Sequence, residues 1–307
     1  MKFVIFVSKR TIDMKKALQF SAIVCLFSWA MFGAFYALCG GDVKSNQILF
    51  TLFETLYMCF PLLVALVLQK IDGEKPSSTG LLKFNLSWAW LVALFIPVAA
   101  VLLCTLISGL MPGVHLEYGP DQMVSQFGLD DETSATLASQ FDAMPPVVML
   151  LVEVLSGLIA GCTINALFAF GEEYGWRNYM VKALEGSGFW KKAVFIGLVW
   201  GIWHAPLILQ GHNYPQHPVA GVALMCVFCI LQGIIELYFV LKTGSVFPAA
   251  IIHGTTNAMA GLVLFFAQGG NDLTVGLTGV AGFLTYAIIC AAIYLYDRFV
   301  SRDMIMS

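Results

Sequence analysis

Residues 245–267 read SVFPAAIIHGTTNAMAGLVLFFA, and this stretch decides the fold class of the chain. A helical membrane span needs about 20 mainly apolar residues, and the stretch meets that length without an Asp, Glu, Lys or Arg. It nevertheless carries His253 and Asn257, which are four residues apart and therefore share one face of a helix. Polar groups at membrane depth are costly unless they face a cavity or a partner. The stretch therefore predicts a transmembrane helix with a polar, functional face.

The rest of the chain has the same apolar character. Of its 307 residues 59% are hydrophobic and only 11% are charged, whereas soluble domains carry about 25% charged residues. The sequence therefore predicts an all-α, polytopic integral membrane protein with about eight transmembrane helices around a polar cavity. The expected spans lie near residues 17–39, 47–68, 87–110, 147–172, 192–210, 219–241, 245–267 and 278–297.

The placement of basic residues predicts the orientation of these spans. Of sixteen Lys and Arg residues, only Lys44 falls outside the N-terminal tail, the C-terminal end and alternate loops. The long loop 111–146 on the opposite side contains neither Lys nor Arg. Basic loops stay in the cytoplasm, so both termini are expected there, with an even number of spans. Residues 1–16 are interpreted as a cytoplasmic basic tail and residues 17–307 as a single membrane domain.

Several classes of protein are disfavoured by what the sequence lacks. No basic patch interleaved with aromatic residues indicates nucleic-acid binding. The eight cysteines include no CxxC pair, so neither a disulfide framework nor a thiolate metal site is indicated. The first span is too long for a secretory signal, and it ends in Tyr36-Ala37-Leu38-Cys39 without the small residue that cleavage favours. We expect that span to be retained. No internal repeat supports a two-halves transporter.

A second polar group falls in Glu172-Glu173-Tyr174-Gly175-Trp176-Arg177. On a helix, Glu173 and Arg177 are four residues apart and form a favourable ion pair. Glu172 points about 100° away, which leaves its carboxylate free for chemistry. The alternative interpretation is a charged helix end at the cytoplasmic interface.

The third group is His204, in Trp200-Gly201-Ile202-Trp203-His204-Ala205-Pro206. Pro206 can kink the helix just beyond this histidine, and the tryptophans can either anchor the interface or line a groove. Taken alone, His204 is more often a packing residue, and His253 with Asn257 is equally well a clamp between helices. Three such groups in separate apolar segments favour one shared site over three coincidences.

In order and on successive spans, these residues resemble the CPBP intramembrane proteases. That family includes the type II CAAX prenyl endopeptidases and bacteriocin-processing, immunity and abortive-infection-like relatives. Its pattern is EExxxR, then an aromatic residue four positions before a histidine, then HxxxN or HxxxB. The resemblance covers roughly residues 147–260, the expected protease-like core. Trp200 stands where phenylalanine is commonest, a change that keeps an aromatic side chain.

The resemblance implies peptide-bond hydrolysis in a membrane cavity that opens to the cytoplasm. Glu172 would be the general base that activates water, assisted by His204. His253 and Asn257 would hold the tetrahedral oxyanion, a role that typically contributes about 10²–10³ in rate for each donor. Glu173 and Arg177 would brace the helix, and Trp200 would line the cavity.

A metal-dependent reaction is the alternative. His204, His253 and Glu172 could ligate zinc as in His₂Glu hydrolases. The sequence contains no HExxH helix, however, and one glutamate cannot easily be both ligand and base, so we favour a metal-independent mechanism. Of the remaining polar groups, Glu54, Glu153 and Glu236 are expected to make interhelical hydrogen bonds. His115, His212 and His217 are expected in solvated loops.

Three functions follow from these observations. We favour a membrane endopeptidase acting on membrane-associated proteins or peptides, with the lipid bilayer and a protein or peptide substrate as its partners and no nucleic acid. A non-catalytic scaffold or bacteriocin-immunity protein is the second hypothesis, and a proton-coupled transporter is the third. In a bacterium the location would be the plasma membrane, and peptide maturation or bacteriocin immunity would be the expected role.

Overall fold

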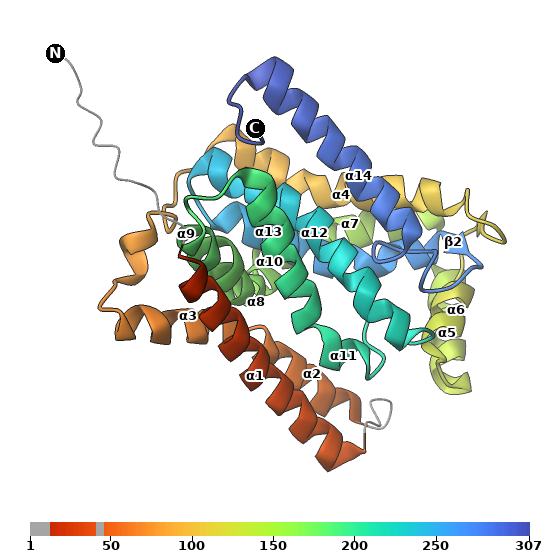
Figure 1. The fold of residues 1–307 in the computed structure, drawn as a ribbon. Coiled ribbons are helices and arrows are strands. Elements are labelled where there is room, and N and C mark those ends of the chain that lie inside the picture. The colour runs from red at the N-terminus through yellow and green to blue at the C-terminus, as the bar shows by residue number, and fades with distance from the viewer. Residues whose placement is uncertain (1–12, 41–45) are drawn as a thin grey trace.

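The protein is a bundle of helices, seen in a computed structural model that describes residues 13–40 and 46–307 (Figure 1). The expected basic tail 1–16 lies mostly outside the described residues, as does Lys44. The helices, including short 3₁₀ and π segments (η), and the two strands are α1 (Met14–Cys39), α2 (Gln47–Tyr57), α3 (Phe60–Ile71), η2 (Pro76–Thr79), α4 (Trp88–Ser108), β1 (His115–Leu116), α5 (Asp121–Phe127), α6 (Asp131–Ala143), α7 (Pro146–Cys162), α8 (Ile164–Glu173), η3 (Tyr174–Tyr179), α9 (Met180–Ala183), α10 (Phe189–Trp203), α11 (Ala205–Ile208), α12 (Pro218–Thr243), α13 (Phe247–Met259), η4 (Ala260–Phe265), β2 (Ala267–Gln268), α14 (Val280–Leu295) and η5 (Tyr296–Ser301).

The prediction of an all-helical, multi-pass membrane protein is confirmed. Within the described part of the chain, six helical stretches are long and apolar enough to cross a membrane, or seven if the bent pair α6–α7 counts as one span. The six stretches are Met14–Cys39, Ile48–Ile71, Trp88–Ser108, Pro218–Thr243, Phe247–Phe265 and Val280–Ser301. They correspond to six of the eight expected spans, and the fourth and fifth spans differ from the prediction.

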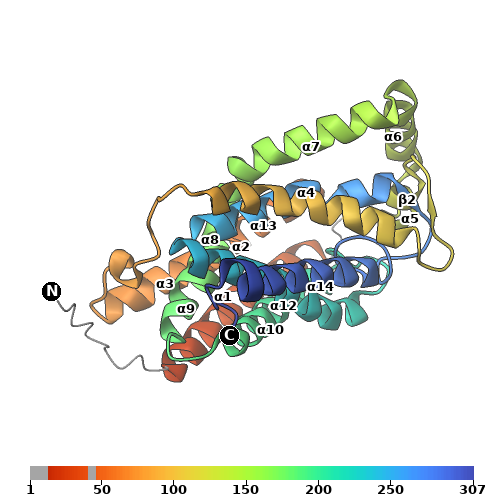
Figure 2. The same cartoon turned by 90° about the horizontal axis from the view of Figure 1, so that it is seen from above.

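The fourth expected span, 147–172, is broken into α7 and α8. The break falls at Thr163, whose backbone leaves the helical region with φ −122° and ψ −101°. The Thr163 hydroxyl donates a 2.6 Å hydrogen bond to the carbonyl oxygen of Ile159, an interaction that bends helices. Figure 2 shows α7 along the edge of the molecule with α6 across its end. The pair α6–α7 bends by 108°.

The fifth expected span, 192–210, is interrupted at His204. Pro206 lacks the backbone N–H that an uninterrupted helix requires, and the N–H groups of Leu207 and Ile208 both donate to the His204 carbonyl. The Trp203 carbonyl is therefore left outside the helical ladder. It accepts instead from the Trp29 indole N–H at 3.1 Å and from the Tyr57 hydroxyl. The resulting α10 is too short to cross a bilayer by itself.

Small residues bring α7 and α8 close to α13. A Cβ atom added at Gly254 would lie 2.7 Å from the Ala166 backbone nitrogen, so only glycine permits this approach. Gly161 of α7 makes a similar approach, because an added Cβ would lie 2.5 Å from the Thr255 Cα. These contacts hold the helix that carries His253 against the helix that carries Glu172.

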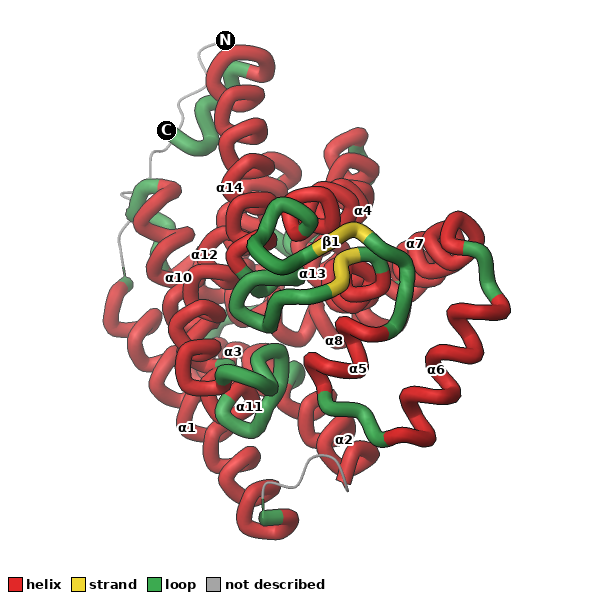
Figure 3. Tube along the Cα trace, turned by 90° about the vertical axis from the view of Figure 1, so that its right-hand side faces the viewer, coloured by secondary structure: helices red, strands yellow, loops and turns green. Residues whose placement is uncertain are grey.

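The end of the bundle opposite the basic loops is closed by the loop 111–146 and the chain after α13. Strands β1 and β2 pair antiparallel there, as Figure 3 shows, with α5 and α6 beside them. The Gln268 side-chain NH₂ donates to the carbonyls of Gly119 and Leu264 at 2.9 and 3.1 Å, and its Oε1 accepts from the Gln122 N–H at 2.7 Å. Because each buried polar atom of Gln268 is satisfied, the loop is fixed to the end of the 3₁₀ segment after α13.

Candidate active site

One cavity of about 210 Å³ brings the predicted polar residues together. Helices α8, α10, α11, α12 and α13 supply most of its buried part, while α2, the start of η4 and the connections before α12 and α14 complete the lining. Its lining includes Glu172, Trp200, His204, His253 and Asn257. Three segments that the sequence left far apart therefore meet at a single site.

Glu172 lies in the buried part of the cavity, and only 2% of its surface is exposed. Its Oε2 accepts a 2.7 Å hydrogen bond from the Trp200 indole N–H. This contact explains why an aromatic residue that carries an N–H suits position 200. The indole fixes one carboxylate oxygen of Glu172 and leaves Oε1 available to a small polar molecule.

His204 is oriented by its own helix. Its Nδ1 lies 2.8 Å from the Trp200 carbonyl oxygen, and since a carbonyl can only accept, Nδ1 must carry the proton. In the neutral ring Nε2 is then the unprotonated acceptor. The His204 ring also packs edge-on against Trp203, with ring centroids 4.8 Å apart. The helix break at His204 thus places a histidine of defined tautomer at the cavity.

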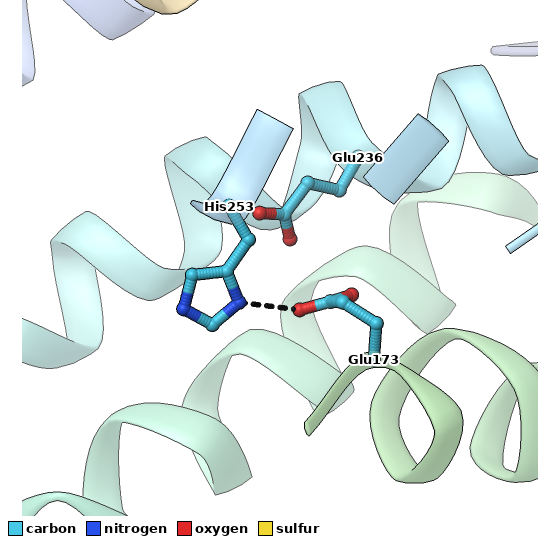
Figure 4. Close-up of side chains that lie close together, drawn as sticks. All are labelled: Glu173, Glu236 and His253. Carbon is cyan, nitrogen blue, oxygen red and sulfur yellow. Dashed lines mark hydrogen bonds and ion pairs between the residues drawn. The ribbon is translucent and has the colours of Figure 1, made fainter. Parts of the chain in front are cut away.

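His253 is oriented by a carboxylate from another helix. Its Nδ1 donates to Glu173 Oε1 at 2.9 Å, the contact drawn in Figure 4. The His253 ring also packs edge-on against Trp200, with centroids 5.2 Å apart. Both neighbours leave Nε2 unbound by described side chains, on a residue that lines the cavity. Glu173 therefore holds the histidine, in addition to the ion pair that the sequence predicted for it.

The predicted Glu173–Arg177 ion pair is present and fully buried, with 3.2 Å between Arg177 Nη1 and Glu173 Oε1. Arg177 also contacts a second carboxylate, since its Nη2 lies 2.5 Å from Glu236 Oε2. The guanidinium carbon lies 4.2 Å from the centroid of a Trp200 ring, a cation–π distance. Arg177 therefore connects the two acids to the indole that binds Glu172.

Glu236 is the member of this network that sequence reasoning did not assign to the site. Its Oε1 accepts a 2.7 Å hydrogen bond from the Gln232 side chain on the same helix. Glu236 lies outside the recognisable motifs. Its place in an apolar segment indicated only that a buried carboxylate needs a cation. Among residues near the motifs, Arg177 was already committed to Glu173, so the second pairing could not be predicted from spacing.

Asn257 lies one turn beyond His253 on α13, and its side chain is exposed into the cavity that both residues line. The shared face predicted from the spacing is therefore present. Gly254 and Thr255 of the same helix are buried against α7 and α8. Helix α13 thus turns its small residues to its neighbours and its donors to the cavity.

The exposed end of the cavity carries an ion pair that the sequence did not predict. His212 Nδ1 lies 3.3 Å from Glu54 Oε1, and these side chains are 27% and 31% exposed. Asn213 and Thr278, from the connections that precede α12 and α14, lie at the cavity with them. Since α12 and α14 run from these connections to Lys242 and Arg298, this end is opposite the basic ends of the helices. His212 is therefore a cavity residue and not a solvated loop residue.

The acidic and histidine side chains of the site are possible zinc ligands. Among the described residues, the acidic and histidine side chains that bring ligand atoms within 4.8 Å of one another are Glu173, Glu236 and His253. Neither Glu172 nor His204, the other predicted ligands, belongs to that group. Both carboxylates of the group contact the Arg177 guanidinium, which already supplies the cation. The cluster in Figure 4 therefore fits an arginine-bridged network better than a zinc centre.

Comparison with known proteins identifies the same region of the chain. Residues 142–259 match the sequence profile described as type II CAAX prenyl endopeptidase Rce1-like. A curated relative, CAAX prenyl protease 2 of Methanococcus maripaludis, is 29% identical over 139 residues, which are 43% of this chain and 48% of the relative. The match thus spans about half the length of that protein. Residues 142–259 contain the Glu172, His204 and His253 motifs, and over this region the chain is similar to the Rce1-like type II CAAX prenyl endopeptidases, the family that the motifs predicted.

Proposed function

We propose that the protein is an intramembrane endopeptidase that hydrolyses peptide bonds of membrane-associated proteins or peptides. The observation that carries the proposal is the meeting of Glu172, His204, His253 and Asn257 at one cavity of about 210 Å³. A cavity of this size accommodates a short piece of peptide backbone and a water molecule. The similarity of residues 142–259 to the type II CAAX prenyl endopeptidases supports the same class of reaction.

Glu172 is the proposed general base. Its Oε2 is held by the Trp200 indole, so Oε1 is available to accept a proton from water. The Nε2 of His204 can accept a second hydrogen bond from that water, because Nδ1 is committed to the Trp200 carbonyl. A positioned acid or base typically contributes about 10²–10⁴ in rate. After attack, Glu172 would return the proton to the leaving amine.

His253 and Asn257 are the proposed oxyanion donors. Charge balance in the buried network supports a protonated His253: Glu173 and Glu236 bring two negative charges, and Arg177 neutralises one of them. Buried charges are stable only when paired, and an imidazolium bonded to Glu173 completes the balance. Its Nε2–H then donates into the cavity, beside the Asn257 amide. Both donors would stabilise the tetrahedral intermediate.

The substrate class follows from the location of the cavity within the membrane bundle. The cavity lies within a bundle of candidate membrane spans, so a membrane-associated segment is the kind of substrate that lies nearest to it. The name of the archaeal relative suggests a C-terminal, prenylated substrate, and an unmodified membrane peptide is the second candidate. The metal-independent form of this mechanism predicts that chelators leave the cleavage rate unchanged.

A comparison of protein termini tests the proposal. Membranes expressing wild-type protein or Glu172→Ala, at matched folded abundance, would be compared by mass spectrometry of N- and C-terminal peptides. We expect a set of fragments that disappears with Glu172→Ala and persists with Glu153→Gln, a control that alters an acid of α7 away from the cavity. Identical termini in all three samples, together with an unchanged host phenotype, would favour the non-catalytic scaffold.

A further inference from the structure

A second, larger recess lies between α4, α12 and α14. Its volume is about 650 Å³, in the range of small-molecule sites, and it shares no lining residue with the catalytic cavity. The three helices are all candidate membrane spans, so this groove faces lipid. Figure 1 shows α14 crossing α4 at an angle, and the two helices are in contact.

The body of the groove is apolar. On α4 its lining runs from Ser87 to Ile96, which at 1.5 Å per residue is about 14 Å. Ile288, Ile289 and Ile293 of α14 form the facing wall. Half of a hydrocarbon core of about 30 Å has the same length, so the groove matches the acyl region of one leaflet.

The end of the groove at the basic side of the bundle is polar. Tyr238 of α12 lines this end and is 3% exposed, and its hydroxyl has no hydrogen-bond partner among the described residues. A buried hydroxyl without a partner costs free energy, which indicates that a ligand atom completes it. Lys242 lies one turn further along α12 and also lines the groove. Trp88 and Tyr296 stand beside it, at the level where aromatic residues favour the interface.

The charges around this end favour an anion. Lys242, Arg298 and Arg302 outnumber the acids Asp297 and Asp303 in the same region. The Lys242 ammonium pairs with Asp303 and lies 5.8 Å from the centroid of the Tyr296 ring. An ammonium group has three donors, so Lys242 can bind a phosphate oxygen while it keeps Asp303.

We propose that this groove binds an anionic glycerophospholipid. One acyl chain lies along α4 and α14, and the phosphate accepts hydrogen bonds from the Tyr238 hydroxyl and the Lys242 ammonium. The site is independent of the catalytic cavity and of the proposed peptidase activity. The lipid contacts three helices that are far apart in sequence, so its binding stabilises the folded protein.

The proposal is tested with purified full-length protein in a mild detergent. Native mass spectrometry and thermal unfolding would measure the binding of phosphatidylglycerol, with phosphatidylcholine and glycerol 3-phosphate as comparison ligands. Val92→Trp fills the groove, whereas Leu91→Trp places the same bulk on the adjacent face; Val92 and Leu91 are 43% and 41% exposed, and only Val92 lines the groove. Tyr238→Phe removes the hydroxyl and keeps the shape of the ring.

We expect phosphatidylglycerol to bind wild-type protein and Leu91→Trp equally and to bind Val92→Trp at least tenfold more weakly. Tyr238→Phe and Lys242→Gln should each weaken binding severalfold. Equal binding to all variants would overturn the site, as would an equal loss in Leu91→Trp and Val92→Trp, the pattern of unspecific surrounding lipid. Equal affinity for phosphatidylcholine would overturn the anionic assignment, and tight binding of glycerol 3-phosphate would show that the groove does not hold an acyl chain.

Discussion

Glu172 and Glu173 are neighbours in sequence with different surroundings. Glu172 is held by one neutral indole donor at the cavity, whereas Glu173 is bonded to both Arg177 and His253 behind it. A carboxylate that is bound to a guanidinium and an imidazole has little remaining capacity to take a proton from water. In the proposed mechanism, the contacts therefore favour Glu172 over Glu173 as the general base and leave Glu173 to position His253.

Glu173→Gln tests that division. The amide keeps the size of the side chain but removes the negative charge that favours an imidazolium at His253. We expect the turnover number to fall by about tenfold or more, towards the 10²–10³ typical of a lost oxyanion donor, with little change in KM. The measurement is cleavage over a range of substrate concentrations, which separates the turnover number from KM. An unchanged turnover number would mean that Glu173 only supports the fold.

Loss of Arg177 is expected to lower the stability of the folded protein. Removal of Arg177 leaves Glu236 buried without its cation and leaves Glu173 paired with His253 alone, and breaking such a buried pair typically costs about 3–5 kcal/mol. Arg177→Gln should lower the free energy of unfolding by that amount. Lys182→Gln, which removes an exposed ion pair with Glu185, should cost less than about 1 kcal/mol.

The double variant Arg177→Gln/Glu236→Gln separates the charge from packing. If the uncompensated acid causes the loss, the double variant will be more stable than Arg177→Gln alone, and a double-mutant cycle will show coupling. Additive losses would contradict the pairing of Arg177 with Glu236. Denaturation in mixed detergent micelles gives these free energies.

Individual residues of the site were predictable where a motif carried them. Glu172, His204, His253 and Asn257 all lie at one cavity. Each of them is recognisable in the sequence as a polar residue in an apolar segment. The partner of each side chain was less accessible. No sequence pattern joins Glu173 to His253 or Arg177 to Glu236, since both contacts cross between helices whose packing is set by many apolar side chains.

Two helix breaks explain why the number of uninterrupted spans was overpredicted. Hydropathy depends on composition alone. It therefore does not reveal that the backbone leaves the helical conformation at Thr163, or that Pro206 leaves the Trp203 carbonyl without its helical hydrogen bond. Both breaks serve the site. The first turns α8 onto α13, and the second ends α10 at His204, where the ring can bond to the Trp200 carbonyl.

The close approach of α7 to α13 at Gly161 can be tested with a matched control on α1. A Cβ at this position meets the Thr255 Cα at 2.5 Å, whereas one at Gly33 of α1 meets nothing within 4 Å. Gly161→Ala should cost about 1–3 kcal/mol through overpacking. Gly33→Ala should instead stabilise the protein by about 0.4–1 kcal/mol, because alanine restricts the unfolded chain. Thermal unfolding of both variants in detergent measures the opposite signs, and equal shifts would contradict the close approach of α7 to α13.

The basic residues and the exposed end of the cavity lie at opposite ends of the bundle. Apart from the buried Arg177, the described basic residues lie at the starts of α1 and α10, at or after the end of α3, and at the ends of α9, α12 and α14. The cavity extends instead to Glu54, His212, Asn213 and Thr278, at the end closed by the loop 111–146. If the basic side is cytoplasmic, the exposed end of the cavity faces outward, against the cytoplasmic opening implied by the family resemblance.

Cysteine labelling in intact cells decides between the two orientations. With the eight native cysteines replaced, Ala135→Cys on α6 and Ser78→Cys on the segment after α3 each present one exposed thiol, from opposite ends of the bundle. Basic loops remain in the cytoplasm, so a membrane-impermeant maleimide should label Ala135→Cys directly and Ser78→Cys only after permeabilisation. A cysteine at His212 should then be labelled from outside, and a peptide substrate offered there should protect it. The reverse pattern would place the cavity mouth in the cytoplasm and show that the charge rule fails for this chain. The membrane-associated substrates would then be cleaved from the cytoplasmic side.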